Sequence, residues 1–313
     1  MWCKRAAAIC SAALVALAGC GPGKPAPSRA GVRPAQLSKR LVARDFMPGD
    51  LDIVLRVDMA RLRAGLGPNV AEAIAARAGD ADADGFVSEA MAKADAVWIG
   101  LRLSDIDAGD RVIVAEGRLG EIHIDPSQWE ETTPTATMES VQILDRLGTA
   151  PRAGTGRIVV YEKKLYAFVS PVEVDATTRV LRDGPDEGRG DPTADGLVSA
   201  DVRGHRLPPS LEKKYPRIGS LIAGVVRVRG SATLGEDGVH VAIDMTTKSA
   251  LAAERVEKFL TTLRESGAQT RFAPLMSTVK LTRVDTHLLL SATVPAAMIV
   301  GALNDANGTT PAP

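Results

Sequence analysis

Two successive stretches of this sequence predict the same order of secondary-structure elements, and they lie on either side of a Gly- and Asp-rich segment at residues 184–196. Each stretch begins with an apolar strand, continues through helical sequence to a pair of strands, and then predicts a helix and a two-stranded hairpin. A proline, Pro171 or Pro295, follows each hairpin and opens a closing helix. The sequence therefore predicts an internal duplication, with residues 51–183 as the first copy, 184–196 as the linker and 197–305 as the second copy.

The predicted strands are joined by short turns rich in Gly and Asp, which are typical of antiparallel pairing. In the first copy the strands are expected at residues 52–57, 96–103, 111–116, 157–162 and 165–169, with a helix at 127–147. In the second copy they are expected at residues 197–202, 223–233, 239–245, 278–284 and 288–294, with a helix at 249–266. The expected fold class is therefore α+β.

The helix expected at residues 249–266 indicates how the layers are arranged. Apolar residues recur on one of its faces, namely Ala252, Val256, Phe259, Leu260 and Leu263. Ser249 can cap its first turn, and Gly267 suits the left-handed position after its last turn. Residues 239–245 alternate between apolar and polar, which gives that strand one polar face. We therefore expect antiparallel sheets that are covered by helices on one face and partly exposed on the other.

The first twenty residues predict export from the cytoplasm. Lys4 and Arg5 form a short basic segment, and the apolar run at residues 6–18 is too short to span a bilayer as a helix. The run ends in the sequence Leu-Ala-Gly-Cys at residues 17–20, which resembles the lipobox of bacterial lipoproteins. An ordinary secretory signal that happens to end near a cysteine is the alternative.

The lipobox resemblance implies that residues 1–19 are removed as a signal peptide and that Cys20 becomes the lipid-modified N-terminus. Several acyl chains would then hold the mature protein on a membrane. Cys3 and Cys10 lie in the removed segment, so no second thiol is left for a disulfide. In that family an aspartate directly after the cysteine commonly retains the protein at the inner membrane, and this chain has Gly21 there. The resemblance therefore implies an outer-membrane lipoprotein that faces the periplasm or the cell surface.

Residues 20–50 are rich in Pro, Gly, Ala and Ser and lack a sustained apolar period, so we expect them to be a flexible tether. Residues 306–313 are expected to form a disordered tail. The whole chain has 38 basic and 38 acidic residues, and its formal net charge is +0. Such a chain has no general basic field, so nucleic acid is not an expected partner.

One acidic stretch resembles the first part of an EF-hand calcium loop. The residues that this resemblance places at ligand positions are Asp80, Asp82, Asp84, Phe86 and Ser88, with Phe86 contributing its backbone carbonyl. Met91 stands where the loop needs a bidentate glutamate, unless Glu89 substitutes for it. The resemblance implies a weak calcium site, and the alternative is an acidic, solvated loop between two helices.

The sequence contains no complete catalytic motif. Ser210 and Lys213 have the Ser-x-x-Lys spacing of penicillin-recognising enzymes, but the partner motifs Ser-Asp-Asn and Lys-Thr-Gly are absent. The prolines nearby favour a short capped helix at this point. Metal-ligand spacing is missing around all four histidines, which are His123, His205, His240 and His287. We therefore expect a protein that is not an enzyme and that has no cofactor apart from the weak calcium site.

The function that these features predict is that of a lipid-anchored cell-envelope protein of non-enzymatic type, acting as an interaction or scaffold module. Its expected partners are the membrane, through the N-terminal lipid, and another envelope protein. The alternative is a carrier or binding protein for an apolar ligand such as a lipid, because a curved antiparallel sheet backed by helices can hold an acyl chain. An apolar concave face would favour the carrier, and a polar one would favour the interaction module.

Overall fold

The computed structural model describes residues 41–79, 85–103, 110–132, 141–147, 156–184, 195–203 and 213–299. These residues divide into two compact units. We call residues 41–61 and 71–184 the N-terminal unit, and residues 62–70 and 195–299 the C-terminal unit. The fold class is mixed α+β, as predicted, and the strands within each unit pair in antiparallel fashion.

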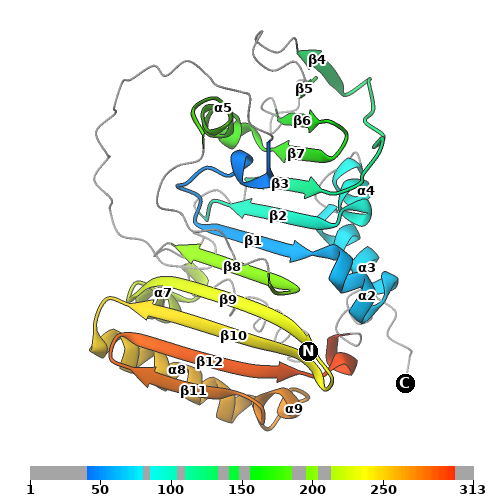
Figure 1. The fold of residues 1–313 in the computed structure, drawn as a ribbon. Coiled ribbons are helices and arrows are strands. Elements are labelled where there is room, and N and C mark those ends of the chain that lie inside the picture. The colour runs from blue at the N-terminus through cyan, green and yellow to red at the C-terminus, as the bar shows by residue number, and fades with distance from the viewer. Residues whose placement is uncertain are drawn as a thin grey trace. The chain divides into compact units, whose positions relative to one another are not determined.

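The described part of the N-terminal unit contains a sheet with the strand order β1-β2-β3-β7-β6-β5-β4 (Figure 1). Its strands are β1 (Ile53–Asp58), β2 (Ala96–Leu101), β3 (Arg111–Glu116), β4 (Trp129–Thr132), β5 (Val141–Arg146), β6 (Arg157–Tyr161) and β7 (Leu165–Val169). Its helical elements are η1 (Ala43–Phe46), α4 (Phe86–Lys93), η3 (Pro171–Glu173) and α5 (Val174–Asp183). Two further helices, α2 (Met59–Leu66) and α3 (Pro68–Gly79), have residues in both units.

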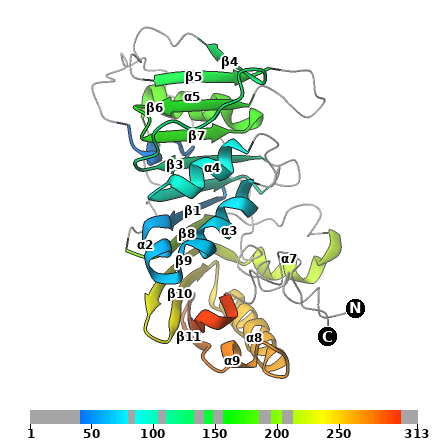
Figure 2. The ribbon, with the colours of Figure 1, turned by 90° about the vertical axis from the view of Figure 1, so that its right-hand side faces the viewer.

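In the middle of this sheet, at β3 and β7, both faces are apolar and both are covered, so the prediction of helices on one face only is wrong for this unit. Four successive residues of β3, 112–115, are all buried. One face belongs to a cluster with Phe46 of η1 and Leu181 of α5. On the other face, the ring of Phe86 in α4 lies 6.1 Å from that of Tyr166 in β7, and α4 and α5 lie on opposite sides of the strands (Figure 2). A strand that is apolar on both faces requires a layer on each of them.

The described part of the C-terminal unit contains a sheet with the strand order β8-β9-β10-β12-β11. Its strands are β8 (Val198–Arg203), β9 (Val225–Gly235), β10 (Gly238–Thr247), β11 (Lys280–Val284) and β12 (His287–Val294). Its helices are α7 (Pro216–Ile222), α8 (Ala250–Gly267) and α9 (Ala273–Met276).

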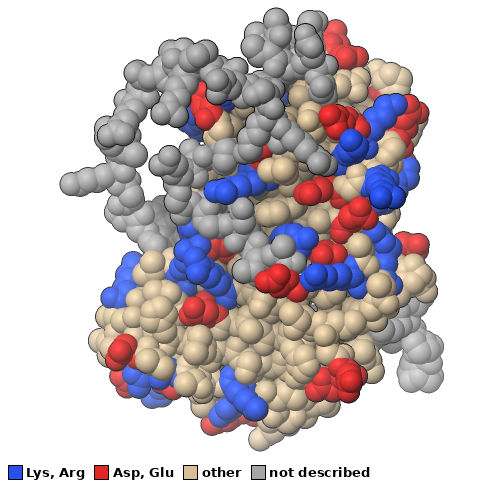
Figure 3. All heavy atoms as spheres, in the orientation of Figure 1, with Lys and Arg blue, Asp and Glu red and all other residues tan. Residues whose placement is uncertain are grey.

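In this unit α8 covers one face of the sheet, as predicted. Val256 of α8 and Leu288 of β12 are buried, and Glu257 of α8 pairs with Arg283 of β11 at 2.7 Å. Because Arg283 is opposite Leu288 in the strand register, both side chains lie on the face of the sheet that α8 covers. Leu289 points to the other face and is 48% exposed. Figure 3 looks onto that exposed face, and few charged side chains lie on it.

The two ends of α8 test two predicted caps. Ser249 caps the helix as predicted, because its Oγ accepts a hydrogen bond from the backbone N–H of Ala252 at 3.2 Å. The left-handed cap at Gly267 is wrong, because Gly267 is the last helical residue and Ala268 continues in a right-handed conformation. A Cβ on Gly267 would lie 2.8 Å from Cγ of Met276. The glycine therefore permits the close approach of α9.

The helix predicted at residues 127–147 is also wrong. The described residues of this stretch form β4 and β5, which pair with each other, and β5 also pairs with β6. Residues 133–140 lie outside the described chain. The stretch is rich in threonine and contains Pro134, and threonine favours strands while proline interrupts a helix.

The closing helix of the first copy begins at Pro171, as predicted, with η3 followed by α5. After Pro295 residues 296–299 are helical, and the rest of the helix predicted there lies outside the described residues. A search of the described helices for a span long and apolar enough to cross a membrane finds none.

Candidate functional site

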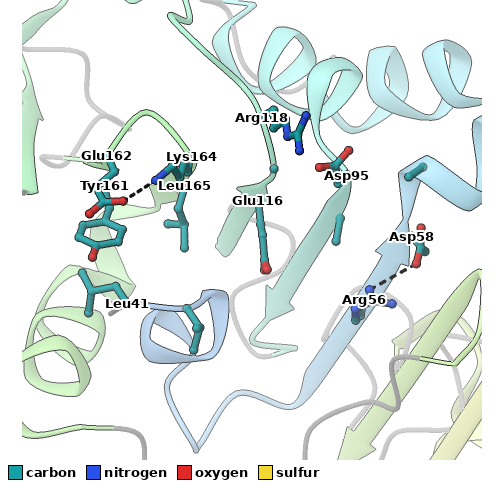
Figure 4. Close-up of a pocket in the computed structure, with 14 residues that line it drawn as sticks. Leu41, Arg56, Asp58, Asp95, Glu116, Arg118, Tyr161, Glu162, Lys164 and Leu165 are labelled. Atoms are coloured by element: carbon teal, nitrogen blue, oxygen red, sulfur yellow. Dashed lines mark hydrogen bonds and ion pairs between the residues drawn. The ribbon is translucent and has the colours of Figure 1, made fainter. Parts of the chain in front are cut away.

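The N-terminal unit contains a hollow of about 660 Å³ at the ends of three adjacent strands (Figure 4). Its walls come from β1, β2 and β3, from the turn between β6 and β7, and from the chain just before η1. Fourteen residues line it, namely Leu41, Val42, Arg56, Asp58, Ala60, Asp95, Ala96, Glu116, Gly117, Arg118, Tyr161, Glu162, Lys164 and Leu165. Seven of these are charged, three basic and four acidic.

The strand register explains why the sheet is hollowed here. Ala96 of β2 is opposite Asp58 of β1 and opposite Glu116 of β3, and Glu116 is in turn opposite Leu165 of β7. Directly paired residues share one face of a sheet, so a methyl group lies between two acidic side chains. Neighbouring strands are about 4.8 Å apart, which places the two acidic residues roughly 10 Å apart with a slot between them.

Asp58 has a structural role at one side of this slot. Its Oδ1 accepts a hydrogen bond from the backbone N–H of Arg61 at 2.9 Å, in the first turn of α2. Its Oδ2 lies 3.4 Å from Nη2 of Arg56, and both side chains are 13% exposed. A carboxylate at a helix N-terminus satisfies free N–H groups and the helix dipole. The charge of Asp58 is therefore balanced within the protein.

The rim of the hollow is held by backbone contacts. The N–H of Gly117 donates to the carbonyl of Lys164 at 2.9 Å, which ties the end of β3 to the turn between β6 and β7. Gly117 has a φ of +151°, and a Cβ there would lie 2.7 Å from the backbone N of Asp95. Only glycine fits this position. On the turn itself, Lys164 pairs with the exposed Glu162 at 2.8 Å.

Glu116 differs from the other acidic residues of the hollow. Within the described chain its carboxylate, which is half-buried, has no ion-pair or hydrogen-bond partner. Arg118 is likewise without a partner among the described residues, and it is exposed. The two side chains point in opposite directions (Figure 4). The hollow therefore holds one acidic group in its lining that the described chain does not neutralise.

A second charged cluster in the same unit has two buried carboxylates, those of Asp110 and Glu173, beside the partly exposed Arg102. Arg102 donates two hydrogen bonds to Glu173, from Nε at 2.5 Å and from Nη2 at 3.2 Å, and Glu173 is fully buried. Ser170 donates to Asp110, whose exposure is 3%. The pKa of Asp110 is raised to about 6, first by burial and then by the neighbouring Glu173, while the hydrogen bond from Ser170 and the charge of Arg102 oppose the rise. Within this cluster, the pair of Arg102 and Glu173 links the end of β2 to η3.

The residues predicted to bind calcium are only partly described. Asp80, Asp82 and Asp84 lie outside the described residues, as does Cys20. Phe86 and Ser88 belong to the first turn of α4, where the ring of Phe86 is buried. The Ser88 hydroxyl donates to the carbonyl of Ala75 at 3.3 Å.

Glu89 could have replaced the missing glutamate of the loop, but its carboxylate has other partners. It accepts hydrogen bonds from Nζ of Lys93 at 2.7 Å and from the N–H of His123 at 3.2 Å. Among the described residues no group of three or more His, Cys, Asp or Glu side chains could hold a metal ion. The calcium site stays a prediction.

None of the other described residues considered in the sequence lines the hollow. Ser210 and His205 are outside the described residues, and Lys213 is exposed. His240 is exposed on β10 and pairs with Asp237 at 3.0 Å. Sequence reasoning missed the residues of the hollow. The sequence indicates these residues only weakly. Its one signal is that a charged residue, Asp58 or Glu116, stands at the end of an apolar strand.

Comparison with known proteins informs the fold alone. No protein-family model matches the chain, and no curated protein matches it. Crystal form I of the Treponema protein TP0453 is similar in structure, with a TM-score of 0.50 and 10% sequence identity over 88% of this chain and 99% of that chain. Crystal form III of the same protein gives a TM-score of 0.50 and 11% identity over 88% and 100% of the two chains.

Proposed function

We propose that this chain is a lipid-anchored protein of the cell envelope, of non-enzymatic type, whose globular part is an interaction or scaffold module. The lipobox resemblance at Cys20 and the glycine after it support an anchor in the outer membrane. The hollow of the N-terminal unit is the surface that we assign to the partner protein.

The observation that carries this proposal is the chemistry of the hollow. Its lining contains seven charged side chains but no Ser, Thr, Cys or His, so it holds no aliphatic hydroxyl, thiol or imidazole group. Most of these charged side chains form ion pairs within the protein, such as Arg56 with Asp58. A charged, partly open hollow with a rigid rim suits recognition of a polar surface on another protein.

Complementation of a deletion strain tests the proposal. Glu116→Lys reverses the unpaired charge of the hollow, and Glu130→Lys makes the same change on the exposed strand β4, away from the lining. We expect Glu116→Lys to fail and Glu130→Lys to restore the envelope phenotypes, with both proteins present at equal levels on an immunoblot. Full complementation by Glu116→Lys would show that the charge in the hollow is not needed for the function.

A second candidate is the carrier of an apolar ligand, and one observation in the C-terminal unit favours it. The second half of α8 presents Phe259, Leu260 and Leu263 only half-buried. Leu281 and Leu290, which are opposite each other on β11 and β12, are also half-buried. Lipid that co-purifies with the protein, detected as a mass excess in a native mass spectrum and lost on denaturation, would favour the carrier.

We also infer that the two units descend from a tandem duplication. The order β1-β2-β3-β7-β6 in one unit corresponds to β8-β9-β10-β12-β11 in the other, which supports this inference. The N-terminal unit then carries β5 and β4 as an addition beyond β6. Superposition of the two sets of five strands tests it, because the connecting helices of related units should also overlap.

A further inference from the structure

We infer that the hollow receives a basic side chain of the partner protein, lysine or arginine, with Glu116 as its counter-ion. This inference rests on the proposed function and names the chemistry of the partner at the same site. Three features of the lining lead to it: one unbalanced charge, one slot and one apolar wall.

The unbalanced charge is that of Glu116. Among the charged groups of the lining, Asp58 is held by Arg56 and by the first turn of α2, and Glu162 is held by Lys164. Glu116 has no such partner in the described chain. A half-buried carboxylate has lost part of its hydration, so an entering cation is attracted more strongly than it would be in open water.

The slot is the space above Ala96. The methyl group of Ala96 lies in the strand register between Asp58 and Glu116, so no long side chain fills the space between them. A single extended side chain fits such a space, whereas a folded domain surface would not reach its floor. Asp58 on the far side is already neutralised, which directs the cation toward Glu116.

The apolar wall comes from Tyr161, Leu165 and Leu41, which lie on the same side of the hollow, away from Asp58 (Figure 4). Leu41 and Leu165 are buried, and Tyr161 is partly buried against the same cluster. The stems of lysine and arginine are three or four methylene groups long and bury readily along such surfaces while the charged head stays polar. An anionic partner is disfavoured, since Arg118 is the one basic residue of the lining without a described partner and it is exposed at the rim.

The test uses the full mature chain in detergent micelles and short capped peptides as probes. Acetyl-Ala-Lys-Ala-amide is titrated while the amide resonances of Ala96, Gly117 and Arg118 are followed by NMR. The peptide with norleucine in place of lysine keeps the stem and removes the charge, and the peptide with glutamate reverses the charge. O-phosphoethanolamine supplies an ammonium group on a short stem, as a lipid headgroup would.

We expect the lysine peptide to shift these three resonances and to bind roughly fivefold more weakly to Glu116→Gln, because a hydrogen-bonded counter-ion is lost. Glu130→Gln, which removes an exposed carboxylate of the same unit, is expected to leave binding unchanged. Equal binding of the norleucine peptide, tighter binding of O-phosphoethanolamine, or no shift with any peptide would overturn the inference. None of these results bears on complementation by Glu116→Lys. The complementation experiment therefore tests the proposed function independently of the peptide titrations.

Discussion

The two units share an order of strands but differ in how they use the second face of the sheet. In the N-terminal unit both faces are packed, and an acidic pair, Asp110 and Glu173, is buried with Arg102. In the C-terminal unit one face is packed; its buried Asp201 is held by Arg227, and a second ion pair, Glu257 with Arg283, remains about one-third exposed. The order of strands therefore does not decide the number of layers. The side-chain pattern along each strand does, since a strand that is apolar on both faces must be covered twice.

The largest difference between the units is expected for core truncation. Phe46→Ala removes a fully buried ring from the N-terminal unit and should lower the free energy of unfolding by about 4 kcal/mol. Phe259→Ala removes a half-buried ring from α8 and should cost about 2 kcal/mol. Urea unfolding followed by circular dichroism measures both. Equal losses would mean that the C-terminal unit is packed as tightly as the N-terminal one.

A second comparison replaces one carboxylate in each unit by its amide. Glu173→Gln removes the buried partner of Arg102, which keeps the exposed Asp50 at 3.1 Å, and should cost about 2 kcal/mol because two charged hydrogen bonds are weakened. Glu257→Gln should cost less than about 1 kcal/mol, because Arg283 can turn to water. Urea midpoints at low salt and at about 1 M salt, where the Debye length is about 3 Å, separate the two variants. The loss in Glu173→Gln should persist at high salt.

In the N-terminal unit the buried Asp110 also predicts a dependence of stability on pH. The folded protein raises the pKa of Asp110 from 3.8 to about 6, so between these values it binds a proton that the unfolded chain releases. This contribution to stability is complete below about pH 4 and is lost as the pH rises through 6.

Asp110→Asn mimics the protonated acid and should remove this dependence. At pH 7 to 8 we expect the variant to be more stable than the original chain by about 2 kcal/mol, and at pH 4 the two should be nearly equal. Thermal unfolding of both proteins across this range gives the difference. A constant difference at every pH would show that Asp110 does not titrate in this window.

The smallest expected effect concerns the cap of α8. Ser249→Ala removes the hydrogen bond to the N–H of Ala252 and should cost about 1 kcal/mol. Both described tryptophans, Trp98 and Trp129, belong to the N-terminal unit, so their fluorescence follows that unit alone. If the fluorescence midpoint in urea stays fixed while the circular dichroism midpoint falls, the units unfold independently. A common shift of both midpoints would show one cooperative transition.

Much of the fold could be predicted where local patterns were strong. The alternation at residues 239–245 and the apolar stripe and cap of α8 led to the correct strand, helix and face. The helix predicted at residues 127–147 was wrong although the stretch had a signal against it, since its threonines favour strands and Pro134 interrupts a helix. The second layer of the N-terminal unit also had a signal in the sequence, since β3 and β7 are continuous apolar runs without polar alternation.

The hollow could not be predicted in the same way. Its residues range from Leu41 to Leu165, and only the register of β1, β2 and β3 brings Asp58, Ala96 and Glu116 into one row. Register depends on packing across the whole sheet, and a slip by one residue would move each of these side chains to the opposite face. Local patterns along the chain do not determine this register.

The half-buried side of α8 has a consequence for how the protein moves. Amide hydrogens exchange with solvent through local openings, and the free energy of each opening depends on how much apolar contact is broken. Strands β3 and β7, whose residues are nearly all buried, should exchange most slowly. The turns of α8 around Phe259 and Leu263 should exchange much faster than its first turns around Ala253 and Val256. One helix would thus contain both an anchored half and a half that opens while the sheet beneath it stays folded.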